Sequence, residues 1–281
     1  MKALGGCGST LLARLLGAVP GTFVLSEVNP RSAYLYSYRL NPLTQVRDWR
    51  PKLSAELTGF DPTELGDCRR FGDFIQMLHR LLAQRAETLI VRDYSYVDYI
   101  GKPYFDQAPT NSSLRAALGH HFELSEVLLV RHPVDQLASL LRHPAVKNVV
   151  DPSNFLDAYE SFLADHSTSM ILRYEDIVCN PLGALRRLCS HWNLSFTEDA
   201  LPDFSGVPAT GFRGTDPETT ICFPSRTKRH FDLARRFRRD DRYWFLLELL
   251  GYEDVLAPKI PIYLSNSIAC FFRSRISRLA A

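Results

Sequence analysis

Short apolar segments that alternate with helical patterns constrain the fold of this chain more than any other feature of its sequence. The apolar segments have the composition of buried strands and span residues 23–25, 88–91, 126–130 and 170–174. Apolar residues recur with helical spacing over residues 9–18, 71–84, 133–141, 155–164 and 181–192. Apolar strands that alternate with helices are typical of a parallel sheet covered on both faces. The sequence therefore predicts an α/β fold, a three-layer arrangement in which helices flank a parallel sheet.

The length of 281 residues suits one large domain or two small ones. No internal repeat or low-complexity segment divides the chain, and we predict a single domain over residues 1–281. Residues 28–87, much of which is rich in proline, tyrosine and arginine, are predicted to form an irregular or helical insertion. Residues 255–281 are predicted to form a C-terminal tail.

Composition and residue spacing argue against several classes of protein. The net charge of +2 disfavours a nucleic-acid-binding protein. The six cysteines show no CxxC spacing and the histidines form no HExxH pattern, so we expect reduced thiols in a cytoplasmic protein and no metal site. The apolar segment 260–272 is short and is interrupted by Pro261, so no membrane span is expected. No apolar region typical of a signal peptide comes near the N-terminus.

A glycine cluster at residues 5–8 (GGCG) comes directly before Ser9 and Thr10, where the first helical pattern begins. Glycines between a strand and a helix let backbone N–H groups converge on a bound anion, and the helix N-terminus adds partial positive charge. Alternatively, the cluster is a plain turn in which Ser9 caps the helix. Loops that bind ATP place a lysine after the last glycine, and Ser9 stands there instead, which disfavours a kinase or ATPase of that type.

Two further segments carry polar residues at the ends of predicted strands. In VLLVRHPVDQLASLL, Arg131 ends a strand and Pro133 begins the next helix. Ser139 lies one to two turns into this helix, so the side chains of Arg131 and Ser139 could contact the same phosphate. Alternatively, Arg131 forms a surface salt bridge with Asp135, and Ser139 is an ordinary helix serine. In the third segment, YED at residues 174–176 follows a strand and precedes a helix that begins with proline.

In this order, residues 3–27, 127–142 and 170–194 resemble the motifs of the sulfotransferase family, whose donor is 3′-phosphoadenosine 5′-phosphosulfate. The family's first loop usually reads P-[RK]-S-G-T-[ST]-L-L and its second motif R-x-P-x-D-x-x-x-S, with a Y-E-D segment and a proline-led helix after them. The resemblance implies a P-loop nucleotide-hydrolase-like fold and transfer of a sulfuryl group to a hydroxyl or amine without a metal ion. The many tyrosines and arginines between residues 32 and 104 suit a sugar, a phenol or an acidic polymer about equally. We therefore expect a small-molecule or saccharide acceptor, bound on the side of the 28–87 insertion.

The resemblance implies roles for individual residues in binding the donor. The first loop is expected to hold the 5′-phosphosulfate through Gly6, Cys7, Gly8, Ser9, Thr10 and Leu11. Arg131 and Ser139 are expected to bind the 3′-phosphate. Tyr174 is expected to lie near the adenine, although a packing role fits this residue nearly as well.

Sulfuryl transfer needs a base that takes the proton of the acceptor. The resemblance implies that Glu27, at the end of the predicted strand that reads FVLSE, is this base. Asp93, which follows another strand, is the second candidate. Alternatively, the neighbouring Arg92 holds Asp93 in a salt bridge.

Gly6 departs from the family's pattern because it stands where the loop usually has a lysine or arginine. Lys2 lies in the preceding strand and is expected to point away from the loop. Another basic residue fills this space, or the activity is low, or the natural chain begins further upstream. Arg226 and Arg229 are the candidates within a late basic run, unless this run is only a solvated helix face. A P-loop small-molecule kinase and a catalytically weak nucleotide-binding protein remain as alternative functions.

Overall fold

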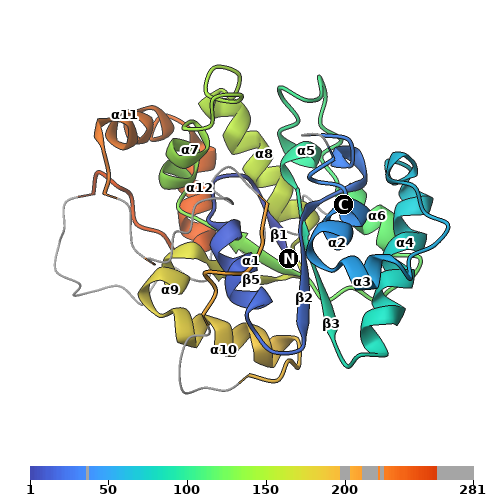
Figure 1. Cartoon of the computed structure of the whole chain (residues 1–281). Coiled ribbons are helices and arrows are strands. Elements are labelled where there is room, and N and C mark those ends of the chain that lie inside the picture. The colour runs from blue at the N-terminus through green and yellow to red at the C-terminus, as the bar shows by residue number, and fades with distance from the viewer. Residues whose placement is uncertain (36–37, 197–202, 211–220, 222–224, 258–281) are drawn as a thin grey trace.

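A parallel sheet lies at the centre of the molecule (Figure 1). The computed structural model describes residues 1–35, 38–196, 203–210, 221 and 225–257. The strands are β1 (Lys2–Ala3), β2 (Thr22–Val28), β3 (Thr88–Asp93), β4 (Val127–Val130) and β5 (Met170–Arg173). β1, β4 and β5 pair in parallel, and so do β2 and β3.

The main chain of Met1 joins the two sets of strands. Its nitrogen donates to the Val91 carbonyl at 2.8 Å, and its carbonyl accepts from the Asp93 N–H at 2.9 Å. The strand order is therefore β2-β3-β1-β4-β5, with β1 in the middle. This order brings the loop after β1 between the ends of β3 and β4, at the edge of the sheet where α/β proteins bind ligands.

The helices that the sequence predicts are present, with small shifts of their ends. They are α1 (Ser9–Gly17), α4 (Cys68–Ala83), α7 (Pro133–Leu140), α8 (Pro152–Asp165) and α10 (Pro181–His191). Asp67, Asp151 and Asn180 fix three of these helices by accepting a hydrogen bond from a backbone N–H of the first turn. The last predicted strand is one residue too long, because Tyr174 already begins the short helix α9 (Tyr174–Cys179).

Helices cover both faces of the sheet because its strands are apolar on both faces. Val127 and Leu129 of β4 pack into a core with α1 and α10. Leu128 and Val130, which point to the opposite face, pack into a core with α7 and α8. This arrangement confirms the predicted α/β fold with a parallel sheet flanked by helices.

The segment 28–87 folds mainly into helices that pack against β2. It contains η1 (Pro30–Ser32), α2 (Pro42–Trp49), α3 (Pro51–Ser54) and η2 (Pro62–Glu64), followed by α4. Phe23 and Leu25 of β2 enter a third hydrophobic core that this segment builds with α6 (Ser113–Leu118). The insertion is thus anchored directly to the strand that carries Glu27.

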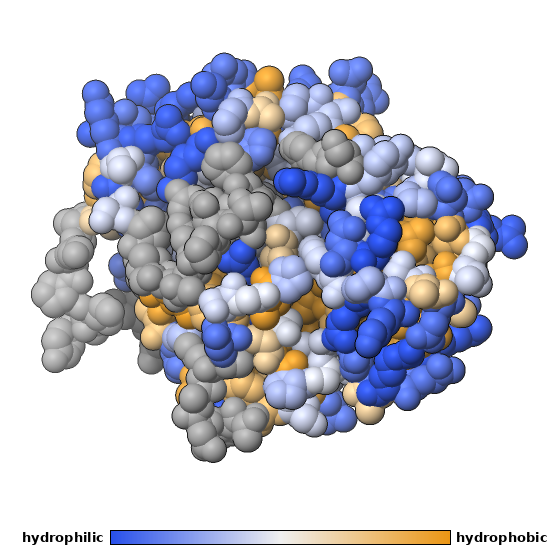
Figure 2. Space-filling view, in the orientation of Figure 1, coloured by the Kyte–Doolittle hydropathy of each residue, from blue (hydrophilic) through white to orange (hydrophobic). Residues whose placement is uncertain are grey.

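Three more helices were not predicted from the sequence. They are α5 (Tyr96–Tyr99), α11 (Lys228–Phe237) and α12 (Asp241–Leu250). α11 lies at the upper left in Figure 1, and Figure 2 shows mostly hydrophilic residues at that corner. Of the helices in the described ranges, none has the length and apolar composition needed to cross a membrane. Most of the predicted tail, from residue 258 on, lies outside the described residues.

Candidate functional site

The loop between β1 and α1 needs glycine at two positions. Gly6 and Gly8 have φ angles of 84° and 88°, in the left-handed region that favours glycine. A Cβ on Gly6 would lie 2.5 Å from the Gln136 carbonyl oxygen, and a Cβ on Gly8 would lie 2.3 Å from the Tyr174 ring. The loop is therefore pressed between α7 and the ring of Tyr174. Gly8 is the N-cap of α1, so the alternative in which Ser9 caps the helix is wrong.

The side chain of Cys7 lies in the hydrophobic core that α1 enters, and that of Leu11 packs against this core. Cys7 is fully buried, and burial raises the pKa of its thiol. The Leu11 N–H is already bonded to the Gly8 carbonyl at 3.1 Å. Of the residues expected to hold the donor's phosphosulfate, Ser9 and Thr10 contribute polar side chains at the first turn of α1.

Arg92 of β3 brings a cation to these two hydroxyl groups. Its Nη2 donates to Ser9 Oγ at 2.8 Å and to Thr10 Oγ1 at 3.1 Å. The same nitrogen lies 2.7 Å from Glu27 Oε1. Only 2% of Arg92 is exposed, so this charge is held in place by the fold. The sequence places Arg92 at the end of a strand but gives it no role at the site. The alternative in which Arg92 pairs with Asp93 is wrong, because successive strand residues point to opposite faces.

Glu27 reaches Arg92 through an irregularity of β2. Leu25 is in register with Val91, and Val28 is in register with Asp93, so two residues of β2 stand opposite the single residue Arg92. Such a bulge changes the direction of a side chain. Glu27 has a φ angle of 56°, and its side chain is 15% exposed, so the carboxylate contacts Arg92 and still reaches solvent.

Asp93 lies on the opposite face of the sheet from Glu27 and is buried. Its carboxylate accepts from Lys2 Nζ at 3.0 Å, from Asn29 Nδ2 at 2.9 Å and from Ser95 Oγ at 2.9 Å. With both oxygens bonded and no exposed side-chain surface, Asp93 is poorly placed to take a proton from an acceptor. The geometry argues against it as a base and confirms that Lys2 points away from the loop.

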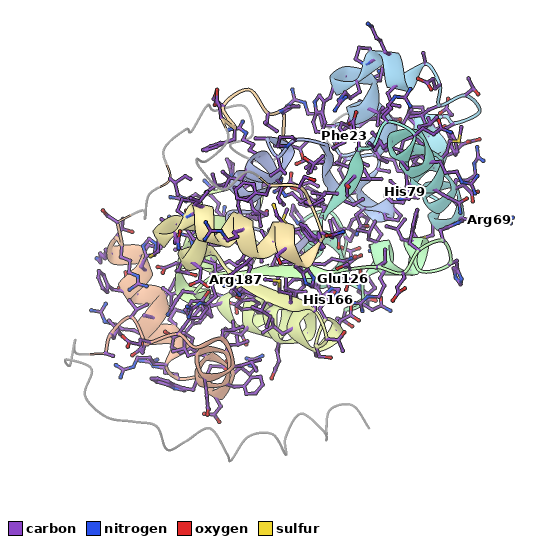
Figure 3. The ribbon with its side chains drawn as sticks, turned by 90° about the horizontal axis from the view of Figure 1, so that it is seen from below. Phe23, Arg69, His79, Glu126, His166 and Arg187 are labelled. Carbon is purple, nitrogen blue, oxygen red and sulfur yellow. The ribbon has the colours of Figure 1, made fainter. Side chains whose placement is uncertain are left out.

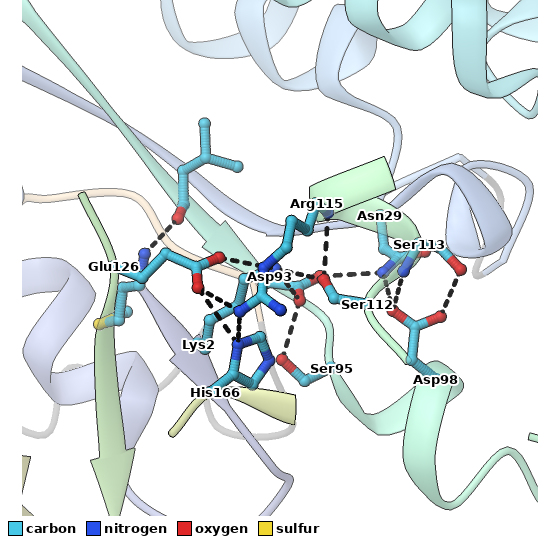
Figure 4. A network of polar contacts seen from close by, with 12 residues as sticks. Lys2, Asn29, Asp93, Ser95, Asp98, Ser112, Ser113, Arg115, Glu126 and His166 are labelled. Carbon is cyan, nitrogen blue, oxygen red and sulfur yellow. Dashed lines mark hydrogen bonds and ion pairs between the residues drawn. The ribbon is translucent and has the colours of Figure 1, made fainter. Parts of the chain in front are cut away.

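Asp93 belongs instead to a buried polar network on that side of the sheet. Figure 3 shows Glu126 and His166 side by side, and Figure 4 shows the network from close by. It contains Lys2, Asn29, Asp93, Ser95, Asp98, Ser112, Ser113, Arg115, Glu126 and His166. The network connects strands with α6 and α8, and its polar groups largely satisfy one another. We therefore assign it a structural role.

Arg131 meets the glycine loop directly. Its Nη1 donates to the Gly6 carbonyl at 3.1 Å, and its Cζ lies 4.4 Å from the centre of the Tyr174 ring. Arg131 is 5% exposed, and its Nε has no partner among the described residues. A buried guanidinium with a donor left over is suited to an anion. Residues more than a hundred positions apart thus form one cluster around Gly8.

Ser139 lies on α7 beside this cluster. The neighbouring Leu140 nitrogen would be 3.0 Å from a Cβ on Gly6, so this part of α7 runs along the loop. The Ser139 hydroxyl accepts from Arg142 Nη2 at 2.9 Å and is partly exposed. A basic side chain therefore lies at the position where a phosphate contact is expected.

The late basic run packs along α7. Arg226 forms two hydrogen bonds with Asp135, at 2.9 and 2.7 Å, so the salt bridge considered for Arg131 forms with Arg226 instead. Burial alone would raise the pKa of Asp135, but the hydrogen bonds and charge of Arg226 outweigh it, so this pKa lies below its usual range. Arg229 donates to the Leu141 carbonyl at 3.4 Å, at the other end of α7. Both arginines thus contact residues of α7 or of its C-terminal end, and α7 is the helix that borders the loop.

Among residues 1–35, 38–196, 203–210, 221 and 225–257, no group of three or more His, Cys, Asp or Glu side chains is arranged to hold a metal ion.

Comparisons with known proteins complete the description. The sulfotransferase domain from the curacin biosynthetic pathway is 18% identical, covers 90% of this chain and 97% of its own, and superposes with a TM-score of 0.49. The sulfotransferase domain of the Synechococcus PCC 7002 olefin synthase is 16% identical, with coverages of 85% and 94% and a TM-score of 0.47. No curated protein matches the chain. The sequence model of the sulfotransferase family matches residues 4–198, more than half of the chain. The chain therefore belongs to the sulfotransferase family.

Proposed function

We propose that the protein transfers a sulfuryl group from 3′-phosphoadenosine 5′-phosphosulfate to a hydroxyl or amine of an acceptor. The observation that carries this proposal is the contact of Arg131 with the Gly6 carbonyl, above a Tyr174 ring that covers Gly8. It joins the two segments that would bind opposite ends of a doubly phosphorylated adenosine. The Nε donor of Arg131, which has no hydrogen-bond partner in the part of the chain that the structure describes, supports an anion at this position.

The residues around the loop fit the donor's two anionic groups. The 5′-phosphosulfate is assigned to the N–H groups of the loop and first turn, with the Ser9 and Thr10 hydroxyls and Arg92 beside them. The 3′-phosphate is assigned to Arg131 and Ser139, and the adenine to the surroundings of the Tyr174 ring. A bound donor supplies an activated sulfur atom and a phosphate leaving group.

Glu27 is proposed as the general base. The acceptor oxygen or nitrogen forms a bond to sulfur, the bond between sulfur and the oxygen of the 5′-phosphate breaks, and Glu27 takes the acceptor's proton. The Glu27 carboxylate suits this role because it is held 2.7 Å from Arg92 at the end of β2, beside the loop hydroxyls. Asp93 is not retained, since its oxygens are bonded on the other face of the sheet.

Arg92 is proposed to replace the cation that the loop lacks at Gly6. A guanidinium fixed beside the transferred group stabilises the negative charge that develops on the leaving oxygen. Arg226 and Arg229 are proposed to contribute further positive charge along α7, on the side of the 3′-phosphate. With Arg92 in place, a fully active enzyme is favoured over a catalytically weak nucleotide-binding protein.

The acceptor is proposed to be a small molecule or a saccharide that enters beside Glu27. The insertion 28–87 contacts the backbone of Ser26, next to Glu27, through the side chain of Gln45, so it borders the site at the edge of β2. Its exposed tyrosines Tyr34 and Tyr38 lie edge to face, with ring centres 6.0 Å apart. Aromatic surfaces of this kind suit a sugar or an aromatic alcohol.

Calorimetric titration of the full chain with adenosine 3′,5′-bisphosphate, the desulfated product, tests the proposal. We expect binding that Arg131→Ala weakens about 10–100-fold, because a charged hydrogen-bond donor is lost. Arg85→Ala is the control, because Arg85 pairs with the distant Glu56 at the surface. No heat of binding to the folded wild-type protein would refute the donor assignment.

Two other outcomes point to the alternative functions. A thermal shift that needs both magnesium and ATP, and that the bisphosphate does not reproduce, indicates a kinase. Tight binding of the bisphosphate together with unchanged slow donor turnover in Glu27→Gln indicates a nucleotide-binding protein without catalysis by Glu27.

A further inference from the structure

The backbone of Glu27 is strained, and something must hold it. Its φ angle of 56° lies in the left-handed region, which a glutamate rarely adopts. Strain of this kind persists only where the surrounding structure over-determines the backbone, and it concentrates at functional sites. The contacts of the residue before it, Ser26, therefore matter for the direction of the Glu27 carboxylate.

The side chain of Gln45, on α2, binds both backbone groups of Ser26. Its Oε1 accepts from the Ser26 N–H at 2.8 Å, and its Nε2 donates to the Ser26 carbonyl at 2.7 Å. This is the pair of bonds that a neighbouring strand would make. β2 is the outermost strand of the sheet, so one amide side chain completes its free edge at the bulge.

Gln45 is itself fixed. Only 2% of it is exposed, and its Nε2 also donates to the Arg39 carbonyl at 3.0 Å. The opposite side of Ser26 is held as well, since its Oγ accepts from Arg92 Nη1 at 2.9 Å and from the Thr210 N–H at 3.1 Å. Ser26 therefore forms hydrogen bonds with the insertion, with β3 and with the segment 203–210.

We propose that Gln45 is a positioning residue for sulfuryl transfer: it holds the Ser26–Glu27 peptide in the bulge, so that the Glu27 carboxylate lies on Arg92. The inference rests on the proposed role of Glu27 as the base. It also gives the insertion 28–87 a second task, because the helix that carries Gln45 shapes the reaction centre and is more than a cover for the acceptor.

Gln45→Met and Gln45→Glu are the informative variants. Methionine nearly keeps the side-chain volume and removes both hydrogen bonds. Glutamate keeps the acceptor for the Ser26 N–H and loses the donor to the Ser26 carbonyl, so it tests the inference even if the methionine variant folds poorly. Asn41→Ala is the matched control, because Asn41 caps the same helix through the Leu43 and Thr44 N–H groups and its side chain forms hydrogen bonds with residues other than Ser26.

The first measurement is donor turnover in water, followed as release of adenosine 3′,5′-bisphosphate at saturating donor. We expect Gln45→Met to lower this rate roughly 10–100-fold, since a small misplacement of a catalytic group costs about that much. The affinity for the bisphosphate, measured by calorimetry, should stay within about twofold of wild type, because the donor residues are untouched. Gln45→Glu should fall between wild type and Gln45→Met, and Asn41→Ala should keep the wild-type rate.

The second measurement is a crystal structure of Gln45→Met. We expect residue 27 to leave the left-handed region and its carboxylate to separate from Arg92. A structure in which Glu27 keeps both features overturns the inference, whatever the activity. Equal loss of rate in Asn41→Ala also overturns it, since stabilising α2 would then suffice. If Glu27 moves while turnover stays unchanged, the positioning by Gln45 holds and the role of Glu27 as the base fails.

Discussion

At the residue scale, the glycine loop depends on close approach as much as on backbone freedom. Gly8 and Gly59 have nearly the same φ angles, 88° and 83°. A Cβ on Gly59 would have nothing within 4 Å, whereas a Cβ on Gly8 would lie 2.3 Å from the Tyr174 ring. The two positions therefore separate the cost of a left-handed backbone from the cost of a clash.

We expect Gly59→Ala to lower the free energy of unfolding by about 1 kcal/mol, the cost of an L residue with a left-handed backbone. Gly8→Ala should lower it by about 2–5 kcal/mol, because overpacking against the Tyr174 ring adds to the same backbone cost. Urea denaturation measures both values. Gly8→Ala should also lose bisphosphate binding, and equal effects of the two substitutions would show that the ring contact is unimportant.

Substitution of Arg92 tests whether this buried guanidinium stabilises charge during the reaction. Arg92→Ala should lower donor turnover by about 10²–10³, the usual effect of removing a fixed donor from a charge-stabilising site. Arg92→Lys should recover only part of this rate. A single ammonium group can take the place of Nη2 beside Ser9, Thr10 and Glu27, but it cannot also replace Nη1, which donates to Ser26 Oγ and to the Thr210 carbonyl. The control is Arg50→Ala, whose salt bridge with Glu87 lies at the surface. Full activity of Arg92→Ala would remove this arginine from the mechanism.

At the element scale, α7 links the glycine loop to the C-terminal helices. The N-cap of α7 is His132, whose Nδ1 accepts from the Val134 N–H at 3.2 Å and whose Nε2 lies 3.0 Å from the Glu253 carbonyl. Burial lowers the pKa of His132, which favours the neutral ring that this pair of contacts requires. The start of α7, just after Arg131, is thus tied to the chain beyond α12.

The ion pair of Arg226 with Asp135 should matter more for the bound nucleotide than for stability. The Arg226 side chain is 40% exposed and the Asp135 side chain 13%, and ion pairs near the surface contribute up to about 1 kcal/mol. Arg226→Ala should therefore lower the unfolding free energy by about 1 kcal/mol at most and weaken bisphosphate binding about 10-fold, less so at high salt.

Arg236→Ala provides the comparison, because Arg236 lies on α11 and pairs with Asp151 at the start of α8. Calorimetry at low and high salt should show wild-type affinity for this control. An equal loss in both variants would mean that the basic run acts only through its overall charge.

The elements were largely predictable from the sequence, and the contacts between them were not. The segments at 88–91 and 126–130 are short apolar runs that predict buried strands. A loop that joins a strand to a helix favours glycine, which explains Gly8. Arg92 and Asp93 stand side by side in the sequence, and only the bulge in β2 decides that the arginine faces Glu27. Gln45 lies in a segment without clear periodicity, so no pattern indicates that its side chain completes the edge of a strand.

At the scale of the whole molecule, the two faces of the sheet have different roles, one in the candidate site and one in the structure. One face carries the loop and Arg92, while the other carries the buried network of Figure 4. In that network the amide nitrogen of Asn29 donates to an oxygen of Asp93 and to an oxygen of Asp98, each at 2.9 Å. One side chain thus links the two carboxylates. Because these two buried carboxylates lie close together, one of them contributes more to the free energy of unfolding at low pH than at neutral pH.

Burial, followed by the charge of Asp93, raises the pKa of Asp98 to about 6. A carboxyl group with a higher pKa in the folded state holds its proton more tightly there. Its contribution to stability is therefore fully present below the pKa of the unfolded chain, about 3.9, and is lost as the pH rises through about 6. Most carboxylates in ion pairs contribute in the opposite direction, so the effect must be isolated by a variant.

Asp98→Asn removes this titration while keeping a side chain of similar size. Between about pH 4 and pH 6, the wild-type unfolding free energy should fall relative to that of the variant, by at most ~3 kcal/mol for a shift of roughly two units. Urea denaturation across this range measures the difference in slope, which does not depend on the constant cost of losing an acceptor for Asn29 and Ser113. Asp48→Asn, at an exposed position paired with Arg47, should leave the slope unchanged. Parallel pH profiles of wild type and Asp98→Asn would mean that Asp98 keeps an ordinary affinity for its proton inside the network.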